Sequence, residues 1–111
     1  MDEKITYEDV LEYENLFSLA PSFMLERWAK KNRNLVAKFK SPIKSHLANL
    51  TSDQKKKLKI ILDSDIDELQ GIMDEAYVKT GKKQYRVLAN PNYKQFIYDN
   101  LNELRKLMDK G

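Results

Sequence analysis

Cysteine is absent from this chain of 111 residues, and glycine and proline occur only three times each. Without cysteine the protein has no disulfide framework, no thiolate nucleophile and no cysteine-based zinc or iron–sulfur site. So few turn-forming residues argue against a fold of many short strands. Because the lack of cysteine also fits a reducing compartment, we expect a cytoplasmic protein.

Long apolar runs and most catalytic signatures are missing as well. No apolar stretch approaches the roughly 18 residues that cross a bilayer, and the acidic start Met-Asp-Glu-Lys does not resemble a signal peptide. His46 is the only histidine, which leaves little for a histidine-based metal site or a Ser–His–acid triad. The three glycines are scattered, so no phosphate-cradling motif is present. We therefore expect no membrane association, no enzymatic activity and no cofactor.

Composition and apolar periodicity predict an all-α fold. With 41% apolar and 33% charged residues, the chain can build one hydrophobic core, so we expect a single helical domain over residues 1–111. Apolar residues recur at helical spacing from 52 to 79, which favours one long helix, although Ser64 could instead cap a separate one. Another helix is expected over about 91–109. With the shorter helices before them, these give a bundle of five or six helices.

Caps and prolines divide the rest of the chain. Thr6 starts a first helix that Pro21 ends. Ser22 starts a second helix to about residue 39, and Ser41-Pro42 is an N-cap and first-turn proline that start a short third. Residues 80–90 are not plainly helical, so an extended segment, a single turn or a small wing-like hairpin is expected there.

Charge is distributed in blocks along the chain. Residues 1–20 carry a net charge of −5, residues 21–62 carry +9, residues 63–78 carry −6 and residues 79–94 carry +5, behind an overall charge of only +3. Opposed blocks can neutralise one another inside the fold, or one of them can face a charged partner.

The two basic blocks are the main candidates for a binding surface. Such a cationic field attracts phosphate without reading sequence, although no zinc-finger, basic-zipper or RNA-recognition signature is present. Docking of the acidic residues 1–20 against the first basic block is the interpretation that needs no partner. The candidate contact residues for nucleic acid or another anionic partner are Arg27, Lys30, Lys31, Arg33, Lys38, Lys40, Lys44, Lys55, Lys56, Lys59, Lys82, Lys83 and Arg86.

Four aspartates have a spacing that resembles the oxygen ligands of an EF-hand loop: Asp63, Asp65, Asp67 and Asp74. Glu68 stands where such a loop needs glycine for its sharp turn, and Asp74 replaces the longer glutamate that binds calcium through both oxygens. The helical spacing of apolar residues also continues through the segment. We therefore favour an acidic outer helix face over a calcium site, and expect no metal.

Protein–protein interaction is the function that these observations favour. The apolar stripes of 52–79 and 91–109 are expected to pack on each other, and any surplus would seat a partner helix or a second copy of the chain. We expect a small non-enzymatic helical protein with a regulatory or adaptor role, bound to another protein or to itself as a homodimer through an apolar stripe. The alternative is a nucleic-acid-binding protein that uses the basic face of residues 27–59.

Overall fold

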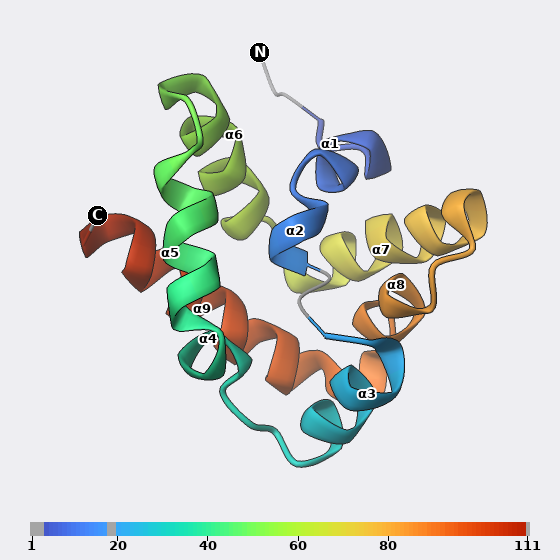
Figure 1. Cartoon of the computed structure of the whole chain (residues 1–111). Helices are drawn as coiled ribbons and strands as arrows, with labels where there is room; N and C mark the ends of the chain where they lie inside the picture. The colour runs from blue at the N-terminus through green and yellow to red at the C-terminus, as the bar shows by residue number, and fades with distance from the viewer. Residues whose placement is uncertain (1–3, 18–19, 111) are drawn as a thin grey trace.

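The computed structural model describes residues 4–17 and 20–110, and these residues form helices and turns without any strand (Figure 1). The all-α prediction is thereby confirmed. In chain order the helices are α1 (Tyr7–Glu12), α2 (Glu14–Phe17), α3 (Ser22–Lys30), α4 (Leu35–Lys38), α5 (Lys40–Ala48), α6 (Ser52–Leu62), α7 (Ile66–Thr80), α8 (Lys83–Leu88), the 3-10 turn η1 (Pro91–Tyr93) and α9 (Lys94–Lys110).

The helices surround one hydrophobic core. In Figure 1, α9 crosses the molecule from the side of α3 and α8 to the side of α5 and α6, where the C-terminus lies. The Cα radius of gyration is 13.0 Å, close to the roughly 13 Å expected of a single domain of this length. Side chains from α1, α6, α7 and α8 meet in the core with no exposed surface: Val10, Leu58, Ile61, Leu69, Ala76 and Tyr85.

The predicted continuous helix over 52–79 is wrong, because two helices, α6 and α7, occupy this stretch. The cap of α7 is Asp65 rather than Ser64: the carboxylate of Asp65 accepts a hydrogen bond from the amide of Asp67 at 2.8 Å. The Ser64 hydroxyl instead donates to the carbonyl of Ile60, at 3.0 Å, near the end of α6. Apolar spacing persists through the turn because both helices bury their apolar faces in the same core.

A side chain from the C-terminal helix stabilises this turn. Nη2 of Arg105 donates to the carbonyl of Leu62 at 2.6 Å and lies 2.8 Å from Oδ1 of Asp63. The carbonyls of a last helical turn have no partner within their own helix. Arg105 of α9 therefore supplies a donor where α6 ends, which favours the break over a continued helix.

The first two predicted helices are also interrupted. A capping box of Thr6 and Asp9 starts α1 as predicted, but that helix ends at Tyr13, whose hydroxyl donates to the carbonyl of Gln54 at 2.8 Å. Residues 18–19 of the predicted first helix lie outside the described residues. The second predicted helix stops with α3, because the chain reverses at Asn32, which has a φ of 49°.

Three further elements start or end at local caps. The Thr51 capping box starts α6, Gly81 ends α7 with a φ of 72°, and Asn90 caps the turn that leads into α9. The predicted start at Ser41-Pro42 is off by two residues, since α5 begins at Lys40. Pro42 is tolerated there because the amides of a first helical turn have no partner within the helix.

Residues 83–88 form the short helix α8, one of the structures expected for the segment 80–90. Tyr85 and Leu88 of α8 are buried in the core, and the helix packs against α7 and α3. The predicted wing-like hairpin is therefore wrong for this segment. Tyr85 and Leu88 are three positions apart, so they lie on the same face of a helix but on opposite faces of a strand.

Candidate interaction surface

The predicted basic contact residues are distributed over several helices and do not share one face. In Figure 1, α3 and α8 lie on the opposite side of the molecule from α5 and α6. We call the residues on and beside α3 and α8 the α3–α8 cluster, and those on α4, α5 and α6 the α5–α6 cluster. The α3–α8 cluster comprises Arg27, Lys30, Lys31, Arg33, Lys82, Lys83 and Arg86, and the α5–α6 cluster comprises Lys38, Lys40, Lys44, Lys55, Lys56 and Lys59.

Most of these cations have no acidic partner among the residues that the structure describes. Lys30 pairs with Glu26 of its own helix at 3.7 Å, and Lys82 pairs with Glu14 of α2. Among residues 4–17 and 20–110, none of the other predicted contact residues forms an ion pair. In particular, no acidic side chain of the described residues pairs with any member of the α5–α6 cluster.

The acidic N-terminal segment contacts the first basic block through Lys57 of α6, and its Glu14 pairs with Lys82. Nζ of Lys57 lies 2.7 Å from Oδ1 of Asp9 and 3.3 Å from Oε2 of Glu12, so these two of the three α1 carboxylates share one ammonium. The hydrogen bond that the Lys57 ammonium donates to Asp9 is the main reason why the pKa of Lys57 is raised to about 12. Partial burial by itself would raise the pKa of Asp9, but hydrogen bonds from Lys57 and Thr6 outweigh it and lower that pKa from 3.8. The described part of the acidic segment therefore neutralises Lys57 and Lys82 and forms no ion pair with the α5–α6 cluster.

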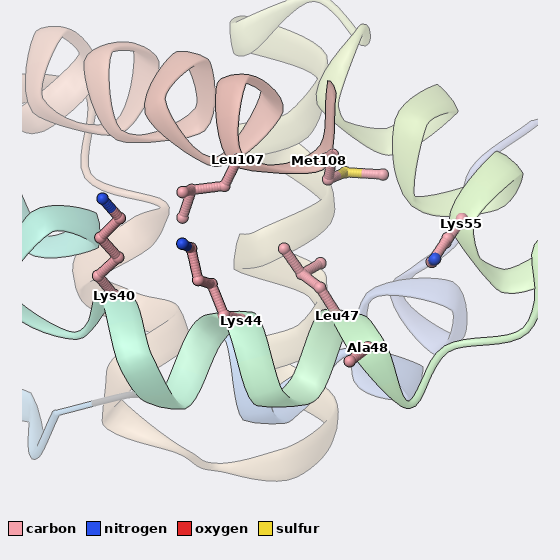
Figure 2. A pocket seen from close by; sticks show the side chains of 7 residues that line it. All are labelled: Lys40, Lys44, Leu47, Ala48, Lys55, Leu107 and Met108. Carbon is pink, nitrogen blue, oxygen red and sulfur yellow. The ribbon is translucent and has the colours of Figure 1, made fainter. Parts of the chain in front are cut away.

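A groove with an apolar floor lies beside the α5–α6 cluster, between α5 and the last turns of α9 (Figure 2). Its volume is about 290 Å³. In Figure 2, Leu47 of α5 and Leu107 of α9 face each other across it, and Lys40 and Lys44 extend from α5 towards α9. The seven lining residues are Lys40, Lys44, Leu47, Ala48, Lys55, Leu107 and Met108.

The sequence of α5 explains why charge and apolar surface meet here. Lys40, Lys44 and Leu47 are spaced four and three residues apart, so they lie on one face of the helix. Leu47 is only 8% exposed, whereas Lys40 and Lys44 are exposed at the edge of the same face. Three ammonium groups, including that of Lys55 from α6, thus surround an apolar floor, and none of the residues that line the groove is acidic.

The placement of these lysines is unfavourable for the isolated helices. Lys40 lies in the first turn of α5, which contains no acidic residue, and Lys55 lies near the start of α6. Cations near a helix N-terminus oppose the helix dipole, and like charges four residues apart, such as Lys40 and Lys44, repel each other. An anionic partner would relieve both costs.

The α3–α8 cluster has a different character. Phe23 of α3 is 66% exposed and lines a shallow hollow together with Glu26, Arg27, Lys30 and Lys31. Beyond the helix, the guanidinium of Arg33 stacks 5.7 Å from the ring centroid of Trp28. This surface presents cations and one exposed aromatic ring, but it lacks the buried apolar floor of the groove.

The four aspartates of the calcium alternative are separated. Asp63 pairs with Arg105, Asp65 caps α7, and Asp67 lies 2.6 Å from Nζ of Lys94, while Asp74 lies exposed within α7. No group of three or more metal-ligating side chains is assembled anywhere in the described part of the chain. The spacing that resembles an EF-hand therefore belongs to a helix break held by caps and ion pairs.

Sequence reasoning identified the lysines of the groove but missed its floor. Leu47, Ala48 and Leu107 were not among the predicted contact residues. Most residues of the apolar stripes of 52–79 and 91–109 pack in the core, where Leu58, Met73 and Leu104 are buried, whereas Met108 of the second stripe lines the groove. The spacing of Lys40, Lys44 and Leu47 was the one signal in the sequence that could have placed an apolar side chain beside the lysines. The contribution of α9 was not visible, because it depends on packing between distant segments.

Comparison with protein-family models, with curated proteins and with solved structures found no match to this chain. Within residues 4–17 and 20–110, no helix combines the length and the apolar character that crossing a membrane requires.

Proposed function

We propose that this protein is a small non-enzymatic helical protein that acts by binding another protein, in a regulatory or adaptor role. The single observation that carries the proposal is the unneutralised α5–α6 cluster beside an apolar groove. Interfaces commonly combine a buried apolar centre with a charged rim that steers the partner and fixes its orientation. A cytoplasmic location is part of the proposal and agrees with the lack of cysteine.

The test is affinity capture from cells that naturally make the protein, with nuclease treatment and two charge-matched variants. One variant, Lys40→Glu with Lys44→Glu, reverses two cations of the groove. The other, Lys83→Glu with Arg86→Glu, makes the same change in net charge on α8. We expect a protein that the wild type and the α8 variant retain after nuclease treatment and that the groove variant loses. Retention that nuclease abolishes for every form would refute the proposal.

Nucleic-acid binding is the second candidate, and the observation in its favour is the number of unpaired cations in both clusters. A single strand could follow the α3–α8 cluster, where Phe23 is exposed among cations and could stack on a base. The test is a titration against generic single- and double-stranded DNA and RNA. This candidate predicts binding that weakens steeply between about 50 and 200 mM salt, and absence of binding at low salt would eliminate it.

A further inference from the structure

We infer that the groove between α5 and α9 binds one amphipathic acidic helix, which inserts an apolar side chain over Leu47 and Leu107 and directs carboxylates to Lys40, Lys44 and Lys55. The inference rests on the proposed function and names the site and the chemistry of the partner. Two observations support this occupant: the charge of the groove and its size.

The positive charge of the groove favours an acidic partner. The three lysines that line the groove come from two helices, and in the described part of the chain none of them has an anionic partner. A basic or neutral segment would leave these ammonium groups partly desolvated without compensation, which is costly. Carboxylates arriving at the edge of the groove would supply the missing counter-charges.

The volume of the groove favours insertion of a side chain over binding of a larger ligand. The volume of about 290 Å³ lies at the low end of the roughly 300–1,000 Å³ of sites for drug-sized ligands. It suits one or two apolar side chains that contact Leu47, Leu107 and Met108. Figure 2 shows α5 and α9 bordering the groove as two ridges with the apolar side chains between them, which is the arrangement in which a third helix can dock.

Nucleic acid fits this groove less well than an acidic helix does. Phosphate contacts use the lysines but leave the apolar floor unused, and in the described structure no aromatic side chain lines the groove to stack on a base. The observations therefore favour a protein segment here, and binding of a polyanion becomes an outcome that the experiment can detect.

The test is a fluorescence anisotropy titration of the full chain with a synthetic peptide. The probe is a fluorescein-labelled helix of about 15 residues, the length at which isolated helices become marginally stable. It carries leucine at positions i, i+3, i+4 and i+7 and mostly glutamate elsewhere. A scrambled peptide of the same composition keeps the charge but has no apolar face. A single-stranded DNA of equal charge tests for general polyanion binding.

We expect the amphipathic peptide to bind more tightly than the scrambled peptide and the DNA. Lys40→Glu with Lys44→Glu should weaken its binding by about tenfold or more, because two attractive charge pairs become repulsive ones. Lys83→Glu with Arg86→Glu, the charge-matched control, should change the affinity less than about threefold, a difference below 1 kcal/mol. Leu107→Ala should weaken binding of the amphipathic peptide but not of the DNA. Circular dichroism melts verify that each variant is folded, and the lysine variants alter only exposed side chains.

Three results would overturn the inference. Equal binding of the scrambled peptide or the DNA would show a general anion site. An equal effect of both charge variants would place binding outside the groove. Sedimentation of the free protein as a dimer that the groove variant dissociates would show a second copy as the occupant. If the peptide does not bind, the capture experiment can still support the proposed function. A failure of this inference is therefore distinguishable from a failure of the proposed function.

Discussion

Replacing Asn100 with alanine should destabilise the protein by more than its surface position suggests. Asn100 lies on α9, and its Oδ1 accepts hydrogen bonds from the amides of Leu35 at 2.7 Å and Val36 at 3.3 Å, at the start of α4. Its Nδ2 donates to the carbonyl of Phe96 at 2.7 Å. A side chain from one helix thus caps another, and α4 leads directly into α5 and the groove.

The size of the effect follows from these bonds. Asn100→Ala leaves two backbone amides without acceptors, and the side chains of Leu35 and Val36 are buried around them. An amide that loses its partner in a partly buried site costs about 1–3 kcal/mol. Because water can reach part of this site, we expect a total loss of about 2 kcal/mol, or roughly 5–10 °C in Tm.

Urea denaturation followed by circular dichroism measures the loss, and Asn92→Ala is the matched control. Asn92 is exposed, and its side chain forms no hydrogen bond in the described structure, so its replacement should change the free energy of unfolding by less than about 0.5 kcal/mol. Amide exchange should also accelerate at Leu35 and Val36. If Asn100→Ala costs no more than Asn92→Ala, the capping argument is refuted.

Four further substitutions test a helix cap, two glycines and an ion pair. Thr51→Ala removes the capping box of α6 and should cost about 1 kcal/mol in thermal or urea unfolding; an unchanged midpoint would contradict the role of the cap. Gly71→Ala should stabilise α7 by about 0.5–1 kcal/mol, because a Cβ there meets nothing within 4 Å. Gly81→Ala should instead destabilise the protein, because the φ of Gly81 is 72°. If both substitutions change the free energy of unfolding in the same direction, this contrast is refuted. The pKa of Asp9 is lowered from 3.8, so its contribution to stability is present above pH 3.8 and is lost as the pH falls through the folded-state pKa. Lys57→Met should reduce the loss of unfolding free energy at acid pH. An unchanged pH dependence would show that the Asp9–Lys57 pair does not contribute to stability.

Local signals in the sequence located the starts of α1, α3 and α6 and the end of α7, while contacts between distant segments accompany the breaks that the sequence missed. The capping boxes at Thr6 and Thr51 depend on residues three positions apart, so a reader of the sequence can see them. The breaks at Tyr13 and Leu62 involve hydrogen bonds to residues 41 and 43 positions away. Apolar periodicity cannot show such breaks, because a broken helix that packs on one core retains its spacing.

The same distinction applies to the groove. Lys40, Lys44 and Lys55 stand out from the sequence because their block contains so few acids. The apolar floor requires Leu107 to lie opposite Leu47, and that proximity arises only when α9 packs across the bundle. The charge blocks therefore suggested the charge of the proposed partner, whereas the shape of the groove could be seen only in the fold.

The most direct test of the central claim is an amide chemical-shift titration of the isotopically labelled protein with the amphipathic acidic peptide. The account predicts shift changes confined to α5, to the start of α6 around Lys55 and to the end of α9 around Leu107, which saturate as the peptide is added. Shift changes centred on α3 and α8, or changes spread evenly over all exposed lysines, would contradict it.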